Sequence, residues 1–259
     1  MTAAGIARNL RLLASRPTVF LGRREYVLIL SHMRSYSSLL AHLLGSHPEI
    51  AGYAEMHVSY TRRRDLLALR AEVARSLDGH VDGRLVLDKV LHDHYPVRSP
   101  VLDDPAVHPI FLVRRPAETL RSILRMNERL PDMVLYPGQE EATKYYVDRL
   151  ASLERLARDR KGGALVLRSE LLVAEPEATL ARLARFLRLE TPIETTYSTF
   201  PLSGVPGRGD FSEAIRQGSV QPRENASPPA ELDPELLDAA ERVHAGCLET
   251  LESLFGTAD

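Results

Sequence analysis

The sequence predicts a single α/β domain in which helices flank a central parallel sheet. Four short apolar runs have the unbroken hydrophobic character of strands that are buried on both faces. Segments with helical leucine spacing separate these runs, and such a strand–helix alternation is typical of a parallel sheet. The four predicted strands are Tyr26–Leu30, Leu85–Leu87, Ile110–Val113 and Ala164–Leu167.

The first strand leads into the most polar turn of the chain. After Tyr26–Leu30 comes the stretch Ser31–Ser38, which is rich in small polar residues, and then a helix with leucines at positions 39, 40, 43 and 44. Gly45 and Pro48 end this helix. Parallel sheets bind ligands at the carboxyl ends of their strands, so we expect this turn to lie at a binding site.

The later helices have clear start signals. Residues 59–77 predict an Arg-rich helix and residues 139–159 a long one. Pro116 and Pro176 each occupy the first position of a helix, and Asp233 caps a final helix. The predicted buried positions are Leu120, Ile123, Leu124, Leu180, Leu183, Ala184, Leu187, Leu237, Ala240, His244, Cys247, Leu248 and Leu251.

We expect one domain over residues 1–259, with a helical extension at 1–25 that contains a surface helix at 3–15. Residues 190–232 are rich in Gly, Pro, Ser and Thr and have little periodicity. Because long irregular segments in compact domains are usually functional, we expect this loop to cover the site. A C-terminal helix at 233–256 completes the domain.

Composition excludes several classes of protein. The net charge is −2, from 33 basic and 35 acidic residues, which argues against a nucleic-acid or membrane-surface binder. The single cysteine, Cys247, excludes an internal disulfide and fits a reducing compartment. We see neither a signal peptide nor an apolar run long enough to span a membrane, and we therefore expect a cytoplasmic protein.

The turn after the first strand has the chemistry of an anion site. Backbone N–H groups at a strand–helix turn point toward one spot, and the helix dipole adds positive character. Arg34 adds a forked cation, while Ser37 and Ser38 add hydroxyls. An ordinary serine-capped helix with a surface arginine would have the same composition. The turn has no glycine-rich pattern and no lysine, so it is not a Walker A loop.

Met33-Arg34-Ser35-Tyr36-Ser37-Ser38-Leu39 resembles the Pro-Arg-Ser-Gly-Thr-Thr-x-Leu phosphosulfate loop of sulfotransferases that use 3′-phosphoadenosine 5′-phosphosulfate (PAPS). His47-Pro48-Glu49-Ile50 is similar to a stretch that often follows it. Arg114, eight residues before Ser122, resembles the second family signature. Glu170-Leu171 and Phe186-Leu187 extend the resemblance, which covers about residues 26–188. Within the family, the chain resembles a bacterial member and is similar to the tyrosylprotein sulfotransferase branch. Met33, Tyr36 and Arg115 replace Pro, Gly and Asn or Asp.

The resemblance implies PAPS as cofactor, 3′,5′-ADP as product and no metal. It implies that Arg34, Ser35, Tyr36, Ser37 and Ser38 bind the 5′-phosphosulfate. It also implies that Arg114 and Ser122 bind the 3′-phosphate. The alternatives are that the Arg114 side chain pairs with a carboxylate such as Glu118 and that Ser122 faces water.

Four side chains are candidates for the chemistry. The resemblance implies that Glu55 is the general base, and His57, two residues on, competes for that role. We expect partial burial to raise the pKa of Glu55. Lys89 ends the second strand and is one of only three lysines among 33 basic residues. With Arg34 it would stabilise charge on the leaving group, unless it pairs with Asp88 or Asp93.

The predicted function is transfer of a sulfuryl group from PAPS to a hydroxyl or amine of a small-molecule or carbohydrate acceptor. An ATP-dependent kinase is an alternative, since Asp88 after a strand resembles the acid that holds Mg²⁺ in nucleotide hydrolases. An inactive sulfotransferase-like binding protein is another. His92-Asp93-His94 suggests a metal only weakly, because no further ligand falls at a suitable spacing.

Overall fold

A five-stranded parallel sheet forms the centre of the protein in a computed structural model. The structure describes residues 19, 24–76, 81, 84–201, 203–204, 213–221 and 231–256. The strand order is β2-β3-β1-β4-β5, so the first strand lies in the middle. The strands are β1 (Tyr26–Ser31), β2 (Ile50–Ala51), β3 (Leu85–Val90), β4 (Val107–Val113) and β5 (Leu165–Arg168).

All four predicted strands are present, and three of them are longer than predicted: β1 by one residue, β3 and β4 by three each. β3 continues to Val90, because its polar residues Asp88 and Lys89 are buried and pair in register with Leu28 and Ile29 of β1. β4 begins at Val107, three residues before the predicted start. The sequence analysis missed β2 and the four-residue helix α4 (Ser99–Leu102), which are too short to show periodicity.

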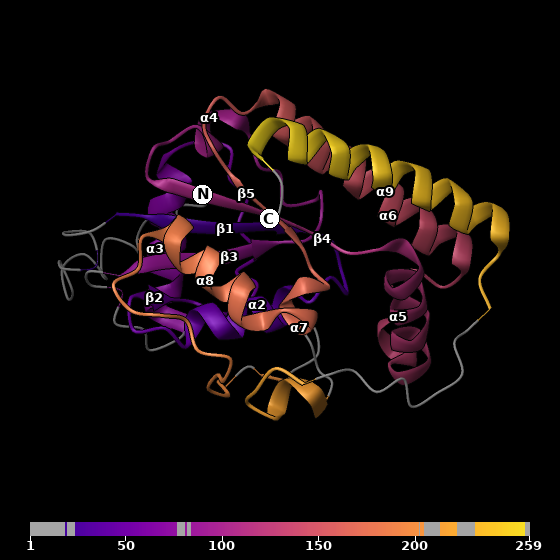
Figure 1. Ribbon diagram of the computed structural model, residues 1–259, viewed down its shortest axis with the longest axis horizontal. Coiled ribbons are helices and arrows are strands. Elements are labelled where there is room, and N and C mark those ends of the chain that lie inside the picture. The colour runs from indigo at the N-terminus through magenta and orange to yellow at the C-terminus, as the bar shows by residue number, and fades with distance from the viewer. Residues whose placement is uncertain are drawn as a thin grey trace.

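Helices cover both faces of the sheet (Figure 1). Side chains on one face of β1, such as Val27 and Ile29, pack against α2 (Ser37–Gly45) and α8 (Pro176–Leu187), with α7 (Leu171–Ala174) beside them. Alternate side chains on the other face, such as Leu28 and Leu30, pack against the remaining large helices. Those helices are α3 (Arg64–Ser76), α5 (Pro116–Arg129), α6 (Gln139–Asp159) and α9 (Pro234–Phe255).

The helix predictions hold with two corrections. α6 has the predicted bounds, and Asp233 caps α9 by accepting two backbone N–H groups through its carboxylate. The predicted helix 59–77 is wrong in its first five residues, since α3 begins at Arg64. Tyr60 pairs with Val97 instead, and the Asp65 carboxylate accepts the N–H groups ahead of the helix. Only Ala240, Cys247 and Leu251 of the predicted α9 stripe are buried, because α9 packs on the outside of α6.

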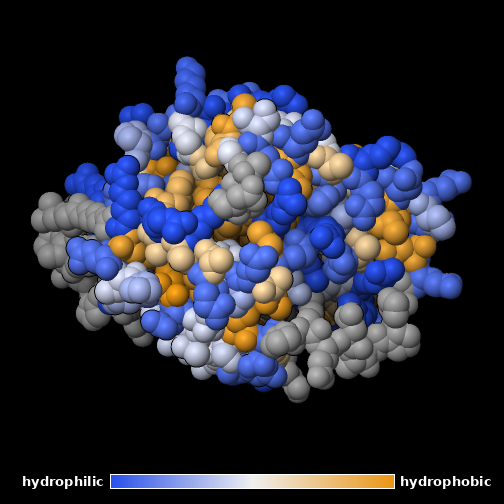
Figure 2. Space-filling view, viewed as in Figure 1, coloured by the Kyte–Doolittle hydropathy of each residue, from blue (hydrophilic) through white to orange (hydrophobic). Residues whose placement is uncertain are grey.

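The segment between α8 and α9 is irregular where it is described. It contains a 3-10 helix, η3 (Glu213–Arg216), and a bridge between Thr196 and Ser219. The predicted helix at 3–15 lies outside the described residues, as do 205–212 and 222–230. Within the described ranges, no helix has the length and apolar character needed to cross a membrane. Hydrophilic residues predominate on the face in Figure 2, with apolar residues in separate groups.

Candidate functional site

The loop between β1 and α2 contains two strained residues. The backbone φ angle is 59° at Arg34 and 62° at Tyr36, both in the left-handed region. This conformation costs about 1–2 kcal/mol for a residue with a side chain, so other contacts must hold the loop. Tyr36 therefore has the backbone that glycine adopts freely at this place in the resembled motif. Its ring lies against the Arg114 guanidinium, with the central carbon 4.2 Å from the ring centroid, a cation–π contact.

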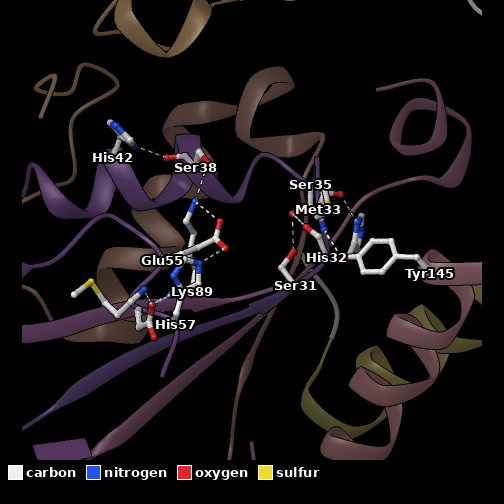
Figure 3. A network of polar contacts seen from close by, with 12 residues as sticks. Ser31, His32, Met33, Ser35, Ser38, His42, Glu55, His57, Lys89 and Tyr145 are labelled. Atoms are coloured by element: carbon white, nitrogen blue, oxygen red, sulfur yellow. Dashed lines mark hydrogen bonds and ion pairs between the residues drawn. The ribbon is translucent and has the colours of Figure 1, made fainter. Parts of the chain in front are cut away.

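Hydrogen bonds within and behind the loop stabilise it (Figure 3). The Ser35 hydroxyl donates to the His32 carbonyl at 2.7 Å and lies 2.6 Å from the Ser31 hydroxyl. The Tyr145 hydroxyl of α6 accepts the Met33 N–H at 2.8 Å. Because the Ser35 side chain is fully buried in these contacts, Ser35 is able to contact a ligand only through its backbone. Ser37, also buried, begins α2.

Four of the predicted cofactor-binding residues lie together. Arg34 Nε donates to the Ser122 hydroxyl of α5 at 2.9 Å. Arg114, at the end of β4, donates from Nη1 to the Arg34 carbonyl at 2.7 Å and from Nη2 to the Tyr36 hydroxyl at 3.3 Å. Ser122 is buried and does not face water. The two predicted motifs are joined by contacts between residues 78 to 88 positions apart in the sequence and therefore form one polar cluster.

The second cluster surrounds Lys89. Its ammonium donates to the Ser38 hydroxyl at 2.8 Å and lies 3.4 Å from Glu55 Oε1. The Lys89 side chain is 1% exposed and that of Glu55 12%. The predicted alternative partners, Asp88 and Asp93, are engaged elsewhere: the Asp88 carboxylate accepts the Lys89 backbone N–H, and Asp93 pairs with Arg149. Figure 3 shows the Lys89 side chain between Ser38 of α2 and Glu55.

The expected rise in the pKa of Glu55 is wrong. Burial does raise this pKa, but the Lys89 ammonium opposes it, as do the His57 imidazole beside Glu55 and the nearby His92. The result is a pKa lowered to about 2. Glu55 is therefore an ionised carboxylate at neutral pH, and its basicity depends on how closely Lys89 stays beside it.

The competing base, His57, adjoins Glu55 and has its own constraints. Its Nε2 lies 3.7 Å from Glu55 Oε2, and its backbone is left-handed, with φ at 54°. Its ring stacks on Tyr95 at a centroid distance of 5.2 Å. The rings of His92 and His94 stack on each other at 5.0 Å. Among the described residues, no three His, Cys, Asp or Glu side chains are grouped in a way that could hold a metal ion.

Asp88 is not arranged like a magnesium ligand. It is 1% exposed, and its carboxylate accepts the N–H groups of Met56 and Lys89 and the hydroxyl of Tyr60. A magnesium ligand at a phosphate site keeps an oxygen free for the metal. The acidic residue after β3, which suggested a kinase, is therefore explained by the hydrogen bonds that Asp88 accepts within the protein.

The sequence analysis missed two residues that support the site. Arg149 of α6 donates to the carbonyls of Ser31 and Val90, and so ties together the carboxyl ends of β1 and β3. His32 accepts the Arg114 N–H at Nε2, and burial lowers its pKa to about 3, which keeps the ring neutral. A charged residue among the apolar positions of the 139–159 helix was a signal for Arg149. Nothing in the sequence distinguished His32.

A shallow recess adjoins the Lys89 cluster. Apolar side chains and the Tyr95 ring line it together with the ionisable groups of Glu55, His57, Asp88 and Lys89. The lining residues are Glu55, His57, Val58, Asp88, Lys89, Val90, Leu91 and Tyr95. The site thus combines a strained anion loop, an arginine–serine cluster and a buried carboxylate–ammonium pair beside a recess.

Solved structures with this arrangement of elements are sulfotransferases. The sulfotransferase domain from the curacin biosynthetic pathway aligns with a TM-score of 0.59 at 18% identity, covering 86% of this chain and 98% of that domain. The sulfotransferase domain from the Synechococcus PCC 7002 olefin synthase gives 0.57 at 20% identity, covering 85% and 94%. Sulfotransferase STF9 from Mycobacterium avium gives 0.53 at 12% identity, covering 94% and 81%.

The chain therefore has the sulfotransferase fold, and the predicted fold class is confirmed. Most of the described chain aligns with these structures, and the curacin domain is covered almost completely. No family model and no curated protein matches the sequence. The similarity is thus one of three-dimensional arrangement, at sequence identities of 12–20%.

Proposed function

We propose that this protein is a PAPS-dependent sulfotransferase that acts on a hydroxyl or amine of a small-molecule or carbohydrate acceptor. The observation that supports this most strongly is the position of Lys89. One buried ammonium contacts both Ser38, at the start of the loop helix, and the candidate base Glu55. Sulfuryl transfer needs an anion site, a cation for the leaving oxygen and a base in one place.

The donor groups of the site suit a nucleotide with several phosphate charges. Arg34, Arg114 and Ser122 form a cluster with two guanidinium groups, and charge-assisted hydrogen bonds to such groups contribute about 1.5–3 kcal/mol each. Arg114 and Ser122 would hold the 3′-phosphate, and the loop with Arg34 and Ser38 would hold the phosphosulfate. Bound PAPS supplies the activated sulfuryl group. Glu55, the ionised carboxylate of the site, already has Lys89 as its counter-charge.

Lys89 links anion binding to the strength of the base. An anion at the loop competes with Glu55 for the ammonium, because Lys89 already contacts the loop through Ser38. When the ammonium moves away from Glu55, burial dominates and the pKa of Glu55 rises. A carboxylate that is a weak base in the resting site thereby becomes a stronger base next to the acceptor.

Ligand binding and product analysis test the proposal in sequence. We expect 3′,5′-ADP to raise the melting temperature more than 5′-AMP or ATP does, since only this ligand has the 3′-phosphate. Incubation with PAPS and a panel of hydroxylated metabolites should give products heavier by one SO₃ group in mass spectrometry. Stabilisation by ATP with Mg²⁺ but not by 3′,5′-ADP would contradict the proposal in favour of a kinase. Binding of 3′,5′-ADP without turnover would leave a binding protein.

The assignment of the base is tested with two matched variants. Glu55→Gln keeps the size of the side chain but cannot take a proton, and we expect turnover to fall about 10²–10⁴-fold. Affinity for 3′,5′-ADP should hardly change. His57→Asn is the control and should retain most of the activity. An inactive His57→Asn together with a nearly normal Glu55→Gln would transfer the role to the histidine.

A further inference from the structure

The residue pair Asp88 and Tyr60 lies directly behind the candidate base and has no role in the chemistry described above. Asp88 projects from β3 in the strand position next to Lys89, so the two side chains point to opposite faces of the sheet. Its carboxylate is 1% exposed and has no salt-bridge partner among the described residues. Instead, Oδ2 accepts the Tyr60 hydroxyl at 2.5 Å.

The other carboxylate oxygen holds the segment that carries Glu55. Asp88 Oδ1 accepts the backbone N–H of Met56 at 2.9 Å and that of Lys89 at 2.8 Å. Met56 directly follows Glu55, in the irregular stretch between β2 and α3. One carboxylate thus connects the strand that carries the ammonium to the segment that carries the base. In this arrangement Lys89 Nζ lies 3.4 Å from Glu55 Oε1.

We propose that Asp88 is a positioning residue for the sulfuryl transfer: ionised Asp88 holds the Glu55 segment in place beside the acceptor recess, and protonation of Asp88 lets this segment move away. The inference rests on the proposed function. It predicts that activity falls in mild acid because Asp88 takes up a proton, and not because the base does. An uncharged carboxyl is a much weaker acceptor for the Met56 N–H than a carboxylate.

The groups around Asp88 determine where it titrates. Burial raises the pKa of Asp88 to about 6, although the hydrogen bonds from Tyr60, Met56 and Lys89 oppose this rise, and the charge of Glu55 adds to it. In the protein without ligand the pKa of Glu55 is about 2, so Glu55 stays ionised while Asp88 takes up its proton, and the rate to follow is kcat/KM, which reports the free enzyme. His92, whose pKa is influenced by Glu55, has its pKa lowered by burial to about 4. Between Asp88 and Glu55, Asp88 is therefore the carboxyl whose pKa lies in the mildly acidic range.

The direction in which the pKa of Asp88 moves in one variant distinguishes this proposal from a purely structural role. The Tyr60 hydroxyl donates to ionised Asp88 and favours the charged form, so its removal in Tyr60→Phe raises the pKa of Asp88. The acid limb of the rate profile should then move to higher pH. Asp88→Asn should lower turnover at least about tenfold and remove the limb near pH 6, with unchanged affinity for 3′,5′-ADP.

The decisive experiment compares pH–rate profiles of the wild type, Tyr60→Phe, Asp88→Asn and Glu55→Gln, with His57→Asn as the control. We expect the limb to persist in the residual activity of Glu55→Gln and in His57→Asn. A limb that survives unmoved in Tyr60→Phe, or disappears in Glu55→Gln, would overturn the proposal. If Asp88→Asn does not fold, the direction of the Tyr60→Phe shift decides alone.

A second measurement needs no turnover and distinguishes failure of this proposal from failure of the proposed function. The Met56 amide should be protected from hydrogen exchange at pH 8, and its protection, corrected for the intrinsic rate, should fall as the pH drops below 6. If protection follows this pattern but the protein has no sulfotransferase activity, the positioning role of Asp88 is kept and the proposed function is rejected. Protection of the Met56 amide that does not change with pH would reject the positioning role of Asp88.

Discussion

The ion pair between Glu55 and Lys89 should be measurable as a stability term, whatever reaction the protein catalyses. Lys89→Met keeps a flexible chain of similar length in a position that is 1% exposed but removes the ammonium. Glu55 then remains as a nearly buried carboxylate without its main counter-charge. Removing one partner of a buried pair costs about 3–5 kcal/mol, because the remaining charge is uncompensated.

The pKa of Glu55 gives an independent magnitude. A fall from 4.5 to about 2 on folding corresponds to a contribution of about 3 kcal/mol at neutral pH. Because the pKa in the folded state is the lower one, this contribution is fully present above pH 4.5 and is lost as the pH falls toward 2. The two routes agree, so we expect Lys89→Met to lower the free energy of unfolding by about 3 kcal/mol at pH 7.

The assay is a double-mutant cycle by urea unfolding at pH 7, using the wild type, Lys89→Met, Glu55→Gln and the double variant. We expect a coupling free energy of about 3 kcal/mol and partial recovery of stability in the double variant, which has no unpaired charge. The pKa of Glu55 in Lys89→Met should rise above its ordinary value, because burial is then weakly opposed. A coupling below about 0.5 kcal/mol would be that of independent sites and would refute the reasoning.

Three further variants test the loop. Arg114→Ala should weaken 3′,5′-ADP at least about tenfold and 5′-AMP much less, and equal losses by calorimetry would remove its role at the 3′-phosphate. Arg34→Ala should lower kcat more than cofactor affinity if the guanidinium stabilises charge in the transition state, so a wild-type rate would place the anion elsewhere. Tyr36→Gly relieves a left-handed backbone worth about 1–2 kcal/mol but loses the contact with Arg114. We therefore expect weaker nucleotide binding without loss of thermal stability, and an unchanged affinity would contradict the cation–π role.

The sequence alone determined the elements with strong periodicity or unbroken apolar runs. β1, β5 and α6 have or nearly have their predicted bounds, because burial on two faces or along one helical stripe leaves a direct pattern in the residues. The polar turn made Arg34 a candidate, and the resemblance to the sulfotransferase signature added Arg114 and Ser122; the structure joins these three residues. β2 and α4 could not be predicted, since two to four residues carry no period.

Only the tertiary structure decided the chemistry of the carboxylates. The sequence placed Glu55 in a loop and implied a raised pKa, but the approach of Lys89 reversed the direction. From the sequence, Asp88 resembled a metal ligand. In the structure its carboxylate oxygens accept the hydroxyl of Tyr60 and the N–H of Met56. A pKa depends on burial and on charges within a few ångströms, and residues 30 or more positions apart supply both. Sequence spacing fixes which groups exist, whereas the fold fixes how far apart they lie.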